Sequence, residues 1–220
     1  MAQLKVAGNG EVTVGKIVCL LRNYRAHAAE MKSAPPKEPY FFLKPSTSVI
    51  HDGGTIIIPR RSKNVHHEVE LAVVIGKRAS HVSKGKAMDC VMGYGVLIDV
   101  TARDVQDEAK KEGRPWAAAK GFDTFAPIST LVSKEKIPDP HNLEIWLKVN
   151  GETRQKGSTS QMIYDIPTII EYVSSIMALE PGDVIATGTP EGVGPLKDGD
   201  AVEACVEGVG SVKVRVASAA

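Results

Sequence analysis

Short apolar segments separated by glycine and proline turns dominate the chain. This pattern is typical of β-strands, which we predict at residues 16–21, 40–43, 55–58, 68–76, 94–102, 143–150, 183–188, 200–206 and 211–216. Asn150 and Gly151 close the strand at 143–150. A type I′ turn needs positive φ at both of its central residues, which Asn and Gly accept readily. The pair therefore predicts a β-hairpin at this point.

Three segments favour helices, at residues 23–32, 102–113 and 165–179. Asn23 is a residue type that caps a helix N-terminus, and Asp165 followed by Pro167 is typical of a helix start. Most successive strands have no helix between them, which argues against a doubly wound parallel sheet. We therefore expect a single mainly β domain with short helices, of the α+β class, over residues 1–220.

Composition narrows the class of partner. The chain has 220 residues, of which 43% are hydrophobic and 24% charged, with 27 basic and 26 acidic side chains. A net charge of +1 without a basic block argues against nucleic acid or an anionic membrane as the partner. Three widely separated cysteines indicate reduced thiols. We expect a cytoplasmic protein, or a mitochondrial one from which a transit peptide has been removed.

Two carboxylates interrupt the apolar strand predicted at 68–76. Val69, Leu71, Val73 and Ile75 share one parity, as in a half-buried strand, and Glu68 and Glu70 share the other. Side chains two apart on a strand point to the same face, about 7 Å apart along the chain. A solvated outer face explains the pair on spacing alone.

A third carboxylate favours a metal site. Asp99 lies within the strongly apolar strand predicted at 94–102, where an unpaired charge is costly. Convergence of Glu68, Glu70 and Asp99 on Mg²⁺, Mn²⁺ or Ca²⁺ would account for all three acids, because these cations prefer oxygen ligands. A zinc site at His66 and His67 is the weaker alternative, since no thiol or third imidazole is nearby in the sequence.

Three further segments carry candidate functional side chains. His27 and Glu30 are three apart on a predicted helix, where the carboxylate can orient the imidazole as a general base; a surface ion pair is the simpler alternative. Lys120 stands among small and apolar residues, so that its ammonium either binds a buried anion or extends to solvent. The small residues around Thr187 and Thr189 form an anion-binding loop or a plain turn.

Together these segments resemble the fumarylacetoacetate hydrolase superfamily. The motifs RNYRAH with a later Glu, FFLKPST, HHEVELAVVIGK, DVTARDVQDE, AAAKGFDTFAPI, KVNGE and TGTPEGVG occur in the family's order. They cover nearly the whole chain. The segments TARDVQDE, KEKIPDPHNL and KVNGETRQ are most similar to the acylpyruvase and oxaloacetate decarboxylase branch.

The resemblance implies a fold, a cofactor and a set of roles. The expected fold is a mixed β-roll, the assembly a homodimer, and the cofactor Mg²⁺ or Mn²⁺ bound by Glu68, Glu70 and Asp99. The catalytic residues implied are His27, Glu30 and Lys120, and those that contact substrate are Arg22, Lys44, Gln106 and Thr189. The position before Arg22 is commonly Gly in the family and is Leu21 here.

The reaction implied is cleavage of a pyruvoyl compound through a pyruvate enolate. Acylpyruvate hydrolysis and oxaloacetate decarboxylation both pass through this species, so a small 2-oxo acid is the expected substrate. Fumarylpyruvate hydrolysis, or isomerisation and decarboxylation of a longer dienedioate, is the alternative within the superfamily. A non-catalytic module with a structural metal is the alternative from another class.

Overall fold

The computed structural model describes residues 2–8 and 10–219. Its strands are β1 (Gln3–Val6), β2 (Gly10–Thr13), β3 (Ile17–Leu20), β4 (Phe41–Lys44), β5 (Val49–His51), β6 (Thr55–Ile58), β7 (Val65–His67), β8 (Val69–Ile75), β9 (Val91–Ile98), β10 (Thr101–Ala102), β11 (Ala126–Ile128), β12 (Val132–Ser133), β13 (Glu144–Val149), β14 (Glu152–Ser158), β15 (Val184–Ala186), β16 (Gly194–Leu196), β17 (Ala201–Val206) and β18 (Gly210–Ser218). The α-helices are α1 (Arg25–Glu30), α2 (Arg103–Lys111), α3 (Ala117–Lys120) and α4 (Ile166–Ile176), and the 3₁₀ helices are η1 (Ser46–Ser48), η2 (Lys84–Cys90), η3 (Lys134–Lys136) and η4 (Thr159–Gln161).

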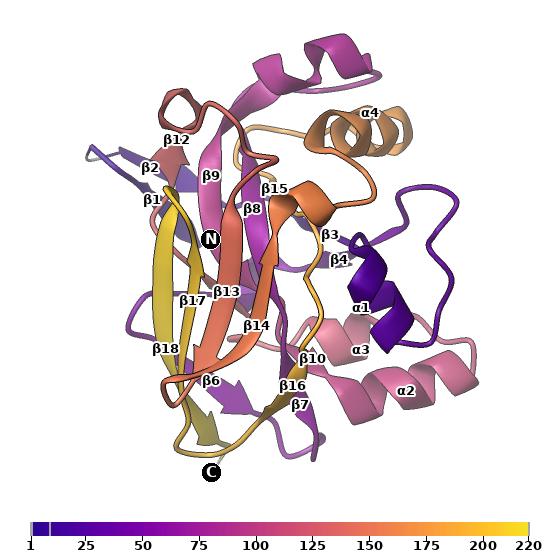
Figure 1. Cartoon of the computed structure of the whole chain (residues 1–220), viewed down its shortest axis with the longest axis vertical. Helices are drawn as coiled ribbons and strands as arrows, with labels where there is room; N and C mark the ends of the chain where they lie inside the picture. Colours follow the sequence, from indigo (N-terminus) through magenta and orange to yellow (C-terminus); the bar gives the residue numbers. More distant parts are fainter. Residues whose placement is uncertain (1, 9, 220) are drawn as a thin grey trace.

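The largest sheet has the order β4-β3-β15-β8-β9-β11-β5, with β12 also paired to β9. Strand β15 runs parallel to β3 and antiparallel to β8, so the sheet is mixed. A second sheet, β14-β13-β17-β18-β6, packs against β8 and β9 (Figure 1). Smaller sheets join β1 to β2, and β10 to β7 and β16. The expected mainly β fold with mixed sheets is confirmed.

Both faces of β8 are buried. Val69, Leu71, Val73 and Ile75 belong to the core between the two large sheets. Ala72 and Val74 belong to a second core on the opposite face, which includes Leu4 of the β1–β2 hairpin. The prediction of a half-buried strand is therefore wrong. The alternation of Glu and apolar residues in the sequence comes from two buried charged positions, Glu68 and Glu70, and not from a solvated face.

The helices largely follow the predicted segments. In α4, Asp165 accepts a hydrogen bond from the backbone N–H of Thr168, as its capping role requires. The helix α1 is shorter than predicted, and Asn23 does not cap it. The buried Asn23 side chain instead donates to the carbonyl oxygens of Tyr164 and Thr187, so that it ties two distant segments together.

Two further details of the predicted strands can be compared with the structure. Asn150 has φ of 52° and Gly151 has φ of 83°, and β13 and β14 pair on either side of them, which confirms the hairpin. The strand predicted at 94–102 ends at Ile98, so Asp99 follows β9 and does not lie within it. Among the described residues, no helix is long and apolar enough to cross a membrane.

In Figure 1, α1, α2 and α3 gather on one side of the sheets, while α4 lies apart from them. Residues of α1, α2 and α3 line one cavity together with Glu68, Glu70 and Asp99. The three acids therefore face this group of short helices. The fold thus brings the predicted functional segments to a single place.

Candidate functional site

Strand register brings the three carboxylates together. Val69 of β8 lies opposite Ile98 of β9, so the residues just before and just after these strands are neighbours. The backbone N–H of Asp99 donates to the carbonyl oxygen of Glu68 at 2.8 Å. Ligand oxygens of Glu68, Glu70 and Asp99 lie within 4.8 Å of one another. The predicted convergence of the three acids is therefore present in the structure.

All three acids are buried, with exposed fractions of 5% for Glu68, 1% for Glu70 and 1% for Asp99. The alternative of a solvated outer face for Glu68 and Glu70 is wrong, because both side chains are buried and β8 is covered on both sides. Burial of carboxylates requires compensating cations or hydrogen bonds. The surroundings of the cluster supply both.

Three cationic side chains contact the cluster. Lys120 places its Nζ 2.9 Å from Glu68 Oε2 and 2.6 Å from Asp99 Oδ2. Lys44 donates to Asp99 Oδ1 at 2.6 Å and to the carbonyl oxygen of Val100 at 2.9 Å. Arg103 forms an ion pair with Glu68 through its guanidinium. Lys120 is 2% exposed, so its ammonium binds buried anions and does not extend to solvent.

The charges act unequally on the acids. Burial opposes ionisation of Glu68, but the ammonium of Lys120 and the guanidinium of Arg103 outweigh it and hold the pKa of Glu68 well below its ordinary value. Burial alone would lower the pKa of Lys120, but the carboxylates of Asp99 and Glu68 raise it above the ordinary value. Both groups are therefore charged near neutral pH.

Glu70 is the acid whose charge is least compensated. Burial raises its pKa well above the ordinary value, and the like charges of Asp99 and Glu68 raise it further. Its carboxylate accepts one backbone hydrogen bond, from Gly188 at 2.6 Å. A divalent cation would relieve this repulsion, and an all-carboxylate set of oxygen donors suits Mg²⁺ or Mn²⁺. The residues present therefore fit such an ion.

The histidine and carboxylate predicted on one helical face do meet. His27 Nδ1 lies 3.1 Å from Glu30 Oε2, and Glu30 Oε1 accepts from the backbone N–H of Gly192 at 3.0 Å. Glu30 thus links α1 to the loop after β15. His27 is buried and lines the cavity, whereas Glu30 lies behind it and is not among the lining residues. The contact with Glu30 can therefore fix the tautomer and the orientation of the His27 imidazole at the cavity wall.

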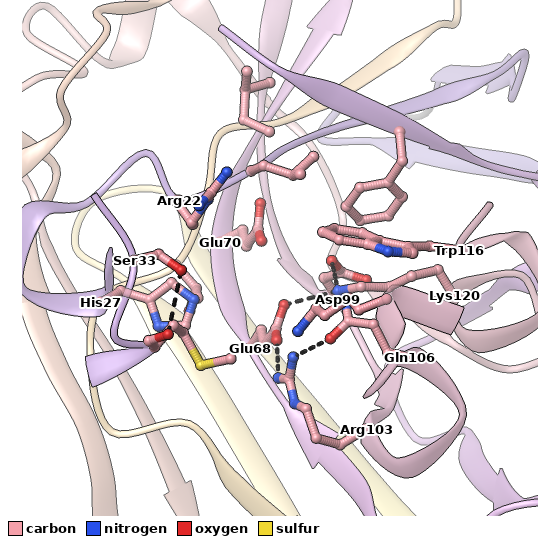
Figure 2. Close-up of a pocket in the computed structure, with 16 residues that line it drawn as sticks. Arg22, His27, Ser33, Glu68, Glu70, Asp99, Arg103, Gln106, Trp116 and Lys120 are labelled. Atoms are coloured by element: carbon pink, nitrogen blue, oxygen red, sulfur yellow. Dashed lines mark hydrogen bonds and ion pairs between the residues drawn. The ribbon is translucent and has the colours of Figure 1, made fainter. Parts of the chain in front are cut away.

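The cavity has a volume of about 390 Å³ and opens beside the acid cluster. Figure 2 shows Arg22 and His27 on one side of the carboxylates, and Arg103, Gln106, Lys120 and Trp116 on the other. The predicted residues that line it are Arg22, His27, Glu68, Glu70, Asp99, Gln106, Lys120 and Thr189. Arg22 has φ of 53°, a left-handed conformation that is uncommon outside glycine. Such a backbone is typical of a functional position.

Lys44 occupies a different place from the one expected. Its side chain is 1% exposed and is not among the residues that line the cavity. It contacts Asp99 from behind, so the structure gives it a role in holding that carboxylate. Direct contact with substrate stays a prediction.

Sequence reasoning missed two residues of the site. Arg103 pairs with Glu68 and also donates to Gln106 Oε1 at 2.6 Å. The signal available in the sequence was the position of Arg103 shortly after Asp99, at the start of a helix. Gln155 lies on the distant strand β14, donates to Thr189 Oγ1 at 2.8 Å and accepts from the backbone N–H of Val69 at 3.1 Å. No local pattern marked it.

The histidines and threonines near the cluster have structural partners. His67 Nδ1 lies 3.0 Å from Gln155 Oε1, and His66 Nε2 lies 2.9 Å from Asn64 Oδ1. Within the described part of the chain, the acid triad is the group of potential ligands close enough to hold a metal, and it includes neither histidine. Thr187 donates its hydroxyl to the carbonyl oxygen of Leu71, whereas Thr189 lines the cavity.

The chain is similar to known proteins over most of its length. Residues 16–217 match the family described as fumarylacetoacetate (FAA) hydrolase C-terminal. The chain is 58% identical over 200 residues to the mitochondrial oxaloacetate tautomerase of Bos taurus, which covers 91% of this chain and 90% of the relative. It is 57% identical over 209 residues to an uncharacterised protein of Pyrococcus abyssi, covering 95% and 93% of the two chains.

A solved structure is similar over almost the entire length. Fumarylpyruvate hydrolase from Pseudomonas aeruginosa, in complex with Mn²⁺ and pyruvate, superposes with a TM-score of 0.94 at 36% identity. The match covers 99% of this chain and 96% of the other. The similarity therefore extends to the whole fold and is not restricted to the site.

Proposed function

Because the chain belongs to the fumarylacetoacetate hydrolase family, we propose that it acts on oxaloacetate and related pyruvoyl compounds through an enolate. Two reactions of oxaloacetate pass through an enolate whose charge lies on the C2 oxygen. Keto–enol tautomerisation removes a proton from C3 and returns it to oxygen, and decarboxylation breaks the C3–C4 bond with release of CO₂. The name of the bovine relative supports the first, and the pyruvoyl unit common to the substrates supports the second.

The observation that carries the proposal is the charge balance of the buried cluster. When all three carboxylates are ionised, as they would be around a cation, their charge equals that of Lys44, Arg103 and Lys120, which pair with Glu68 and Asp99. A divalent cation held by Glu68, Glu70 and Asp99 would supply Lewis-acid stabilisation of negative charge that develops on the substrate. The site would then carry an excess of two positive charges, which complements a dianion such as oxaloacetate.

The side chains around the cavity have distinct roles in this proposal. Lys120 and Gln106 bind and orient the oxygens of the pyruvoyl group, and Thr189 adds a hydroxyl to the cavity wall. His27, oriented by Glu30, lies at the cavity wall and exchanges the proton at C3. Arg103 holds Glu68 and Gln106 in place. Negative charge on the enolate oxygen is stabilised by the ammonium of Lys120.

Acylpyruvate hydrolysis is a second candidate. The similar hydrolase of Pseudomonas aeruginosa holds Mn²⁺ and pyruvate, which is the product of such a cleavage. Here His27 would remove a proton from water, the resulting hydroxide would attack the distal carbonyl, and pyruvate enolate would leave and take up a proton. The same cavity accommodates either reaction, because the pyruvoyl end is bound in the same way.

A substrate panel tests the proposal. Purified protein is incubated with oxaloacetate, acetylpyruvate and fumarylpyruvate in Mg²⁺, in Mn²⁺ and in EDTA. Enol and keto forms are followed by ultraviolet absorbance, and pyruvate is followed with a coupled assay. We expect metal-dependent turnover of oxaloacetate. No turnover of any pyruvoyl compound under these conditions would favour the non-catalytic module with a structural metal.

The choice between Mg²⁺ and Mn²⁺ and the assembly are also proposals. Activity titrated with each ion separates the two metals, and light scattering tests the homodimer expected from the resemblance. A cytoplasmic or mitochondrial location stays a prediction, to be checked by fractionation of the source cells.

A further inference from the structure

One face of α2 follows the cavity from the acid cluster to the opening. Arg103, Gln106 and Lys110 are spaced at i, i+3 and i+7, so they share one side of the helix, and all three line the cavity. Arg103 and Gln106 are buried at 7% and 3% exposure, whereas Lys110 is exposed. The helix therefore presents a series of polar groups that begins at Glu68 and ends at solvent.

Lys110 is held over the cavity by two contacts. Its Nζ lies 3.2 Å from Asp107 Oδ1 and 5.6 Å from the centre of the Trp116 ring, and Trp116 lines the cavity as well. The ring of Trp116 in turn packs on Phe42, another residue of the wall, with 5.9 Å between centroids. These contacts keep an exposed ammonium close to the opening instead of leaving it extended into solvent.

We propose that Lys110 binds the distal carboxylate of a dianionic substrate and so selects dicarboxylates over neutral-tailed pyruvoyl compounds. This inference rests on the proposed function, in which Gln106 and Lys120 hold the pyruvoyl end. Four residues, about 6 Å along the helix axis, separate Gln106 from Lys110. The carbon chain of a four-carbon dicarboxylate is of the length needed to extend from the first residue to the second.

Other groups near the opening serve this role less well. Arg22 also lines the cavity, but Figure 2 places it on the far side of Glu70 from Arg103 and Gln106. Lys111, the next residue of α2, is exposed and is not among the residues that line the cavity. Lys110 is thus the cation that continues the same wall outward from Gln106.

The test compares two substrates that share the pyruvoyl end. Oxaloacetate has a distal carboxylate, and acetylpyruvate has a methyl ketone in its place. We expect Lys110→Gln to lower the ratio of kcat/KM for oxaloacetate to kcat/KM for acetylpyruvate by about threefold to fivefold, mainly through KM, which is the upper end of the scale for one exposed ionic contact. Lys110→Glu should lower the ratio further by repulsion, and Lys110→Arg should restore it. Added salt should raise KM for oxaloacetate in the wild type more than in Lys110→Gln, because screening acts on the contact that the variant lacks.

Two matched variants separate recognition from helix stability. Lys111→Gln removes the same charge from the same helix outside the cavity, and we expect an unchanged ratio. Asp107→Asn removes the ion pair but leaves Lys110 in place, and we expect an unchanged or higher ratio. The proposal would be overturned if Lys110→Gln lowered kcat/KM equally for both substrates. It would also be overturned if Lys111→Gln or Asp107→Asn lowered the ratio as much as Lys110→Gln does. Turnover of neither substrate by the wild type would instead contradict the proposed function.

Discussion

The acid cluster and the helix α1 face each other across one cavity, but they are built in different ways. Glu68, Glu70 and Asp99 lie at the ends of paired strands, and their positions follow from the register of β8 and β9. His27 and Glu30 lie on a helix of six residues, which has no side-chain cap at its N-terminus. Helices this short derive their stability from tertiary contacts.

The acid cluster and the helix α1 also differ in the contacts that stabilise them. The cluster is fixed by buried ion pairs from Lys44, Lys120 and Arg103. The helix α1 is held by individual hydrogen bonds to loops, among them that of Gly192 to Glu30 and that of Asn23 to Thr187. The difference indicates that the sheet holds the acid cluster rigidly, while the proposed general base, His27, is carried on an element that can move at lower energetic cost.

The largest effect on activity should come from substitutions in the acid cluster, which lies at the ends of the strands. Glu70→Gln or Asp99→Asn should reduce activity by more than about 100-fold, since losing a ligand exceeds the usual effect of losing its supporting residue. Glu70→Gln should leave the metal-free fold intact, because it removes one of several like charges. Calorimetry with Mg²⁺ and thermal unfolding check the two parts. Unchanged Mg²⁺ affinity in both variants would contradict the metal assignment.

A smaller effect is expected from the helical region. His27→Ala should reduce acylpyruvate hydrolysis by about 100-fold, the scale of a lost general base, and oxaloacetate decarboxylation by less, because that step needs no activated water. Steady-state rates on both substrates measure the difference. An equal fall would mean that the proton His27 returns to C3 also limits decarboxylation, so that activation of water is not its main task. Glu30→Gln is the companion variant, which keeps the helix but weakens the orienting contact.

Competitive inhibition by oxalate tests the acid cluster separately from the helix α1. It is a planar dianion with the shape of a pyruvate enolate, and species of this kind bind more tightly than ground states. We expect competitive inhibition at least about tenfold stronger than by malonate, whose methylene breaks planarity. His27→Ala should change the inhibition constant of oxalate little. Assays with Mg²⁺ in excess of the inhibitor exclude simple chelation, and equal inhibition by oxalate and malonate would remove the support for an enolate-binding site.

The smallest effect concerns α2, which forms the third wall of the cavity. Burial opposes ionisation of Asp104, but the hydroxyl of Ser62 and the backbone N–H of Lys63 outweigh it and lower the pKa of Asp104 below its ordinary value. Its contribution to stability is therefore present above the ordinary Asp pKa of about 3.9 and is lost as pH falls through the lower, folded value. Asp104→Asn should decrease the melting temperature slightly at pH 7.

Melting curves of wild type and Asp104→Asn across this pH range provide the measurement. The gap between them should close as the solution is acidified. A gap that stays constant to the lowest pH at which the protein folds would show that the charge of Asp104 is not what anchors α2 to residues 62–63.

The local patterns of the sequence located most of the longer strands and the helices α1, α2 and α4, but they missed α3 and short strands such as β1, β2, β5 and β16. Alternation and turn residues located the main strands and the Asn150-Gly151 hairpin, since these depend on neighbouring residues in the chain. The motifs also located the acids, His27, Glu30 and Lys120. The sequence could not place the end of the β9 strand at Ile98 or bury both faces of β8, because these features depend on what packs against the strand.

Only the tertiary structure decided which partner each charge has. Lys44 is 55 residues from Asp99 in the chain, yet its ammonium binds that carboxylate from behind. Arg103 and Gln155 reach Glu68, Val69 and Thr189 from other elements, at separations that no short motif encodes. A buried charge is stabilised by whatever group the fold brings within hydrogen-bonding distance. Residue type and spacing, together with the family resemblance, therefore indicated which residues form the candidate site, whereas sheet pairing and packing determined their partners, their burial and their pKa values.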